Sequence, residues 1–213
     1  GLKNSTASGN SFFGVCAGYL TTTGVTNVAI GGNSFDANTT GACNVAVGAG
    51  SLGANTTASF NTAVGYEALT CNITGANLTA VGFRALCRNT GADNAAFGHG
   101  ALAVSTTGGT NTAIGTSSFG SHTTGNNNTG VGAAVGYSLT TGSNNLLLGK
   151  NAGRSTSPAT VTTGSNNVVL GDNSIANAYI KVDWTVTSDL RDKTEITNVP
   201  HGLNLSLIHI SEP

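Results

Sequence analysis

A glycine recurs every 17 residues along most of this 213-residue chain, with one interval of 16 and one of 22. Self-similarity at a short fixed period is typical of a solenoid, in which each repeat is stabilised by stacking on its neighbours. The sequence therefore predicts an all-β protein, a parallel β-solenoid (a β-helix or β-roll) of about ten 17-residue coils. The marker glycines are Gly14, Gly31, Gly48, Gly65, Gly82, Gly98, Gly115, Gly132, Gly149 and Gly171.

The residues before each marker glycine have the alternation of a short strand. The position directly before the glycine is large and apolar, and the position two residues earlier is mostly β-branched or small. These two positions share one face of a strand, and we expect that face to line the interior of the coil. A second apolar column, four residues after the marker, is expected to complete the interior. Its members are Phe35, Leu52, Leu69, Leu86, Leu102, Phe119 and Ile175.

The residue between those two strand positions is also apolar, but small. Because a solvent-facing strand position is normally polar, a continuous small apolar column on the outer face predicts that something packs closely against it. We expect this partner to be further copies of the same chain in a homotrimer, although the sequence alone does not set the number at three. The column consists of Ala29, Ala46, Ala63, Ala80, Ala96, Ala113 and Gly130.

A Thr-Gly pair recurs about ten residues after the marker glycine. Glycine there predicts a turn with a positive φ. Asparagines at equivalent positions of adjacent coils are expected to stack and to exchange side-chain hydrogen bonds. The glycines of this pair are Gly24, Gly41, Gly75, Gly108, Gly125 and Gly142.

Composition narrows the class of partner. Charged residues make up 8% of the chain and the net charge is −1, against about 25% charged residues in ordinary globular domains. Without a basic stripe the chain is not expected to bind nucleic acid. No run approaches the roughly 18 apolar residues of a membrane span, so no membrane insertion is expected.

The shaft has few residues that could carry chemistry. Its carboxylates do not fall in one column, which argues against a polysaccharide-cleaving enzyme. The four cysteines lie at different offsets and form no CxxC pair, so we expect buried or semi-exposed free thiols, with Cys71 and Cys87 able to lie near each other on consecutive coils. His99 and His122 are isolated and are expected at the surface or in turns. No cofactor and no metal are expected.

After Asn177 the period stops and charge rises, since eight of the chain's 17 formal charges fall in residues 181–213. This segment contains the motif Ser188-Asp189-x-x-x-Lys193. It resembles the junction where bacteriophage tail-fibre and tailspike shafts enter a C-terminal intramolecular chaperone, the endosialidase-type self-cleaving peptidase domain. The repeat around residues 61–75 resembles the shafts that precede this domain, and it is also similar to the heads of trimeric autotransporter adhesins.

The resemblance implies a self-processing fibre. The chaperone would drive trimerisation and then release itself by autoproteolysis between Ser188 and Asp189, with Ser188 as nucleophile and Lys193 as general base. A hydroxyl is a poor nucleophile until a neighbouring base takes its proton, and a lysine can act as that base where burial lowers its pKa. Any enzymatic activity would thus be confined to a complete C-terminal domain.

We therefore expect three regions: a repeat shaft at 1–177, a junction with the start of a truncated chaperone domain at 178–204, and a non-native tail at 205–213 that resembles translated adapter sequence. The expected function is the structural and adhesive shaft of a phage tail fibre in the virion tail, which attaches to a bacterial surface receptor, a glycan being one candidate. The alternative is the head or stalk of a trimeric adhesin on the bacterial cell surface. The start at Gly1 without methionine suggests further sequence upstream.

Overall fold

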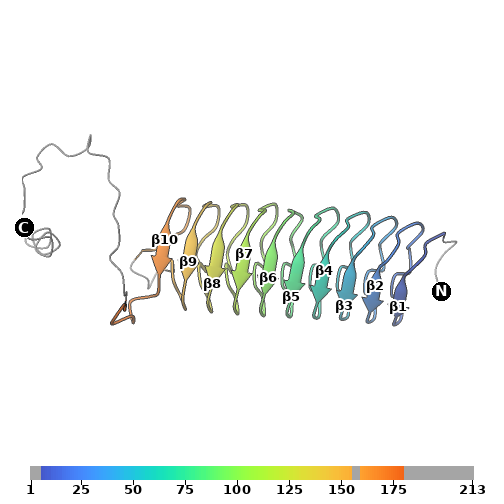
Figure 1. Ribbon diagram of the computed structural model, residues 1–213, viewed down its shortest axis with the longest axis horizontal. Coiled ribbons are helices and arrows are strands. Elements are labelled where there is room, and N and C mark those ends of the chain that lie inside the picture. Colours follow the sequence, from blue (N-terminus) through green and yellow to red (C-terminus); the bar gives the residue numbers. More distant parts are fainter. Residues whose placement is uncertain (1–5, 155–158, 180–213) are drawn as a thin grey trace, which may run out of the picture. The chain divides into compact units, whose positions relative to one another are not determined.

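The structure is a computed structural model, and it describes residues 6–154 and 159–179. Ten three-residue strands, one for each repeat, form a single parallel sheet in the order of the sequence (Figure 1). This confirms the parallel β-solenoid with about 17 residues per coil. The strands are β1 (Ser11–Phe13), β2 (Val28–Ile30), β3 (Val45–Val47), β4 (Thr62–Val64), β5 (Thr79–Val81), β6 (Ala95–Phe97), β7 (Thr112–Ile114), β8 (Thr129–Val131), β9 (Leu146–Leu148) and β10 (Val168–Leu170).

The register follows the repeat. Equivalent residues of successive coils lie opposite each other, as Ala29 does to Ala46 in β2 and β3. The longest interval keeps this register, because Leu146 of β9 pairs with Val168 of β10 although 22 residues separate them. The additional residues of that repeat therefore do not interrupt the sheet. By its contacts the chain divides into two units, Gly1–Ala176 and Asn177–Pro213, and only the first is described almost throughout.

The expected inner and outer faces of the strands are exchanged in the structure. The middle residue of each strand points into the coil: Ala29, Ala46 and Ala63 are fully buried. The residues on either side of it point outward, and Ile30 and Val64 are 43% and 36% exposed. The alanine column therefore lines the interior and cannot be the surface that a second chain covers, so the expectation from the sequence is wrong on this point.

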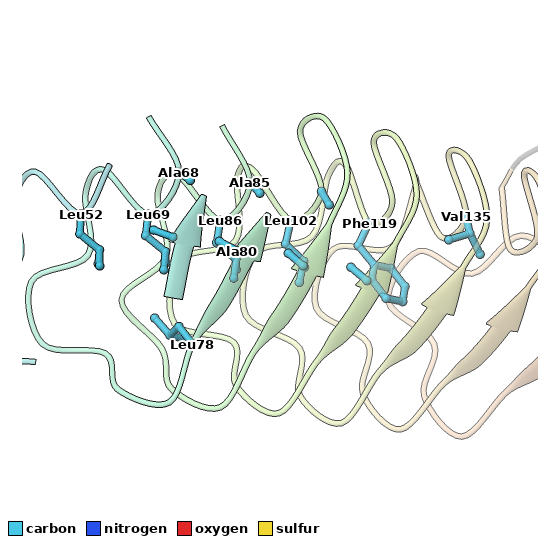
Figure 2. Packing of buried hydrophobic residues seen from close by; sticks show 14 of the residues in the cluster. Leu52, Ala68, Leu69, Leu78, Ala80, Ala85, Leu86, Leu102, Phe119 and Val135 are labelled. Carbon is cyan, nitrogen blue, oxygen red and sulfur yellow. The ribbon is translucent and has the colours of Figure 1, made fainter. Parts of the chain in front are cut away.

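The reason is the narrow width of the coil. The column four residues after the marker, expected to be interior, is indeed buried from Phe35 to Phe119, although Ile175 at its end is 60% exposed. Figure 2 shows Leu69, Leu86 and Leu102 of this column at equivalent places in successive coils, with Ala80 on the strand side. One large side chain from this column fills the interior of a coil, so only a small residue fits on the strand.

Two exceptions to this size rule, in β1 and β9, come as compensating pairs. Where the strand carries Phe12 in place of alanine, the facing position is Gly18, and a Cβ there would lie 2.6 Å from Cζ of Phe12. Leu147 is matched in the same way by Gly153, whose Cβ would lie 2.8 Å from Leu147 Cδ1. Close packing leaves no room for both members of a pair to be large.

The marker glycines end the strands in a conformation that other residues rarely adopt. Gly31 has φ +134°, and a Cβ on it would lie 2.7 Å from the carbonyl oxygen of Gly48 in the next coil. This part of φ/ψ space is essentially restricted to glycine. The period of the sequence thus arises from a backbone requirement repeated once per coil.

The glycine of the Thr-Gly pair has a different role from the one expected. Its φ is not positive in any of the six copies. A side chain is excluded instead because the coils approach closely there: a Cβ on Gly75 would lie 2.5 Å from the carbonyl oxygen of Gly91. Positive φ falls on other positions, including the buried column, where Leu52 has φ +49° and Leu69 φ +54°.

Asparagine side chains form the expected hydrogen-bonded ladder inside the coil. The backbone N–H and the side-chain amide of Asn44 both donate to Oδ1 of Asn27, over 2.9 and 3.1 Å. The same amide donates to the carbonyl oxygen of Ala58 in the following coil, over 2.9 Å. Leu78 interrupts the ladder, and it resumes at Asn94. Because buried amides cost free energy when unpaired, this pairing ties each coil to its neighbours.

Candidate functional site

The catalytic residues expected from the C-terminal motif are Ser188, Asp189 and Lys193, and all three lie outside the described residues. The site that the structure does describe is therefore the surface of the repeat shaft.

The outward face of the sheet carries one apolar row along its length. The residue before each marker glycine is large and apolar in every strand, and the residue two positions earlier is β-branched or apolar in most strands and partly buried. Among the former, seven are more than a third exposed: Phe13 78%, Ile30 43%, Val64 36%, Phe97 40%, Ile114 41%, Val131 39% and Leu170 51%. We call the residues directly before the marker glycines the outward column.

The outward column is regular because the register is regular. Ile30 pairs with Val47, and Val47 pairs with Val64, so each coil adds one apolar side chain in line with the last. Contiguous apolar patches on the surface of a soluble protein mark interaction surfaces, and a row of apolar side chains in register is a candidate for one. The alternation in the sequence identified this column but placed it inside the coil.

His122 was expected in a turn or at the surface, and this prediction is wrong: it is fully buried. It occupies the inner position that Asn38, Asn55 and Asn72 hold in earlier repeats, seven residues after the marker glycine. Its Nδ1 lies 3.3 Å from the hydroxyl of Ser105 in the preceding coil. Burial lowers the pKa of His122 to about 4. The imidazole is therefore neutral at pH 7 and packs in the interior of the coil without a buried charge. His99 is exposed, as expected.

The cysteines are free thiols, as expected. Cys87 is buried, but Cys16, Cys43 and Cys71 are exposed rather than buried or semi-exposed, so the expected burial is wrong for these three. The N–H of Cys71 donates to the carbonyl oxygen of Cys87 over 2.9 Å, which confirms that the two lie on adjacent coils. Burial raises the pKa of the Cys87 thiol, so this thiol is less ready to ionise than an exposed one.

Three of the four carboxylates in the described part of the chain are separately engaged. Glu67 pairs with Arg84, Nε to Oε2 at 3.2 Å, and Asp93 accepts a hydrogen bond from the amide of Asn77 over 3.0 Å. The backbone N–H of Ser174 donates to Asp172, and this bond lowers the pKa of Asp172. In residues 6–154 and 159–179, no three His, Cys, Asp or Glu side chains are grouped so that they could hold a metal ion.

No family model matches the chain, and neither a curated protein nor a solved structure is significantly similar to it. The part of the chain that the structure describes contains no helix able to cross a membrane. Its function is therefore inferred from the geometry of the shaft.

Proposed function

We propose that this chain is the structural and adhesive shaft of a bacteriophage tail fibre, which presents a receptor-binding surface to a bacterial host. The observation that supports this role is the outward column on an in-register solenoid. Each coil contacts its neighbours through backbone hydrogen bonds, the asparagine ladder and a filled interior, so the shaft is built to be stiff and long. The engaged and scattered carboxylates favour a structural role over a hydrolytic one.

The shaft functions as a homotrimer whose chains meet through the outward column. Burial of apolar side chains such as Ile30, Val64 and Ile114 stabilises the assembly by about 25 cal/mol per Å² removed from water. Copies of the same chain are the natural partners because the column repeats with the coil, so identical chains side by side match each other along their whole length. The outward column takes the place of the alanine column as the proposed contact surface of the trimer.

The C-terminal segment carries the motif for maturation of the fibre. By resemblance to the self-cleaving chaperone family, Lys193 takes the proton of the Ser188 hydroxyl, and the peptide bond between Ser188 and Asp189 is cut after the trimer has formed. Water completes the new carboxyl end at Ser188, and the leaving amine of Asp189 takes up a proton. This step requires the complete chaperone domain, and it would place the mature shaft in the virion tail.

Intact mass tests this function. The chain is expressed with its natural C-terminal continuation restored, beside a Ser188→Ala variant and a control variant, Thr187→Ala, which removes the hydroxyl one residue away. The proposal predicts that the parent and Thr187→Ala lose everything after Ser188, while Ser188→Ala stays whole. If all three remain whole, the motif is only a charged turn, and the head or stalk of a trimeric surface adhesin becomes the better assignment.

A further inference from the structure

Three aromatic rings stack on the surface of adjacent coils. Tyr66, Phe83 and His99 each follow the marker glycine of their repeat directly. The ring centroids of Tyr66 and Phe83 lie 5.5 Å apart with an interplanar angle of 12°, and those of Phe83 and His99 lie 5.0 Å apart at 7°. Tyr66 is 51% exposed and Phe83 44%. The same position is small or polar in the flanking coils, where it holds Gly32, Ala49, Thr116 and Ala133.

A groove of about 330 Å³ lies beside this stack, lined by Phe83 and His99 together with Arg84 and Arg88. Its volume is within the range of small-ligand sites, which combine apolar and aromatic walls with a few polar groups that orient the ligand. Phe83, Arg84 and Arg88 belong to one coil and His99 to the next, so the stacking of the coils brings these residues to one groove.

Positive charge is concentrated here. The described part of the chain contains four Lys and Arg residues, and two of them, Arg84 and Arg88, line the groove. Arg84 is held by Glu67, Nε to Oε2 at 3.2 Å. Arg88 is exposed and forms no ion pair with another described residue. A guanidinium in this position can bind a carboxylate through two parallel hydrogen bonds.

We infer that this groove binds an acidic sugar residue of a surface glycan. The apolar face of a pyranose ring packs against the aromatic stack, and its carboxylate pairs with Arg88 while Arg84 borders the same space. One unpaired guanidinium, that of Arg88, suits a single anionic group better than a polyphosphate backbone, which needs a longer basic track. The inference rests on the proposed adhesive function and specifies the chemistry of its receptor.

Calorimetric titration of the full chain in its assembled state tests this inference. The probes are an oligosaccharide of a hexuronic acid and the same oligosaccharide with its carboxyl groups reduced to alcohols. The acidic probe is expected to bind at least about tenfold more tightly, because a charge-assisted hydrogen bond distinguishes the two. Arg88→Gln and Phe83→Ala should each weaken its binding about tenfold. Lys150→Gln, which removes an exposed charge from a distant coil, should leave binding unchanged.

Equal binding of the two probes, absence of binding, or equal losses in Arg88→Gln and Lys150→Gln would overturn the inference. So would a Phe83→Ala variant that changes the mass of the assembly, since the groove would then be an interface between copies. Because Arg88 is exposed, Arg88→Gln is expected to fold. Its binding of the acidic probe tests the inference even if Phe83→Ala fails to fold. Cleavage at Ser188 and the oligomeric state are measured in separate experiments. A failure of glycan binding therefore leaves the proposed function untouched.

Discussion

In β2 to β8 the two faces of each strand carry residues of different size, and the smaller residue is inside. Ala63 points into the coil and is fully buried, whereas its neighbour Val64 points outward and is 36% exposed. In a thick sandwich a β-branched residue would be the better core residue. In a coil this narrow, Leu69 from the opposite wall already fills the space, so the strand contributes only a methyl group. The larger residues then remain outside, where they are available to a partner.

The largest loss of stability is expected from substitution of a marker glycine, which ends a strand of the sheet. Gly31→Ala should destabilise the protein by about 4 kcal/mol, because φ is +134° and the added Cβ would meet the backbone of Gly48. At the adjacent Gly32, an added Cβ would have no heavy atom within 4 Å, and Gly32→Ala should change stability by less than about 0.5 kcal/mol. Denaturant unfolding at one protein concentration compares them, and equal losses would contradict the backbone origin of the period.

A double-mutant cycle examines the inner face next. Leu69→Gly should cost about 3 kcal/mol by leaving a cavity, and Ala63→Leu about 2 kcal/mol by overfilling the coil. The double variant reproduces the pairing of Leu147 with Gly153, so its loss should be smaller than the sum by at least about 1 kcal/mol. Unfolding free energies of the four proteins give the coupling. Strict additivity would mean that the two positions do not share one space.

The burial of His122 also predicts that the stability of the protein depends on pH. His122 is neutral when folded, with a pKa of about 4 against 6.5 for the free side chain. Between these values the unfolded chain binds a proton that the folded chain does not, so stability is complete above pH 6.5 and is lost as the pH falls toward 4. The gap corresponds to at most about 3 kcal/mol.

His122→Asn restores the residue type of the equivalent inner position in earlier coils, and it should abolish this part of the dependence. Thermal unfolding from about pH 4 to 7 compares the two proteins. A slope that is unchanged in His122→Asn would show that another group is responsible.

Much of the fold could be predicted from the sequence because its causes are local. The period, the strand in each repeat and the asparagine ladder arise from residues that each coil repeats. The direction of the two faces could not be predicted from alternation, because both faces are apolar. The signal lay in the irregular copies: Phe12 with Gly18 and Leu147 with Gly153 reveal which columns face each other. Alignment of His122 with Asn55 would likewise have placed it inside.

The surface site was harder to predict for a different reason. Tyr66, Phe83 and His99 differ in residue type, and only the 17- and 16-residue spacing places their rings in one stack. Arg84 and Arg88 belong to a single coil, and their relation to His99 depends on contact between coils. The catalytic motif at Ser188 remains a prediction, since it falls outside the described residues.

The use of the outward column for assembly is tested most directly by the molar mass of the full chain in solution. Light scattering is compared for the parent and for a variant with Val64→Lys and Ile114→Lys, which leaves the buried positions untouched. A trimer is expected for the parent and a lower mass for the variant, because charged side chains would disrupt the apolar contact. A parent that is a folded, soluble monomer would contradict assembly through this column.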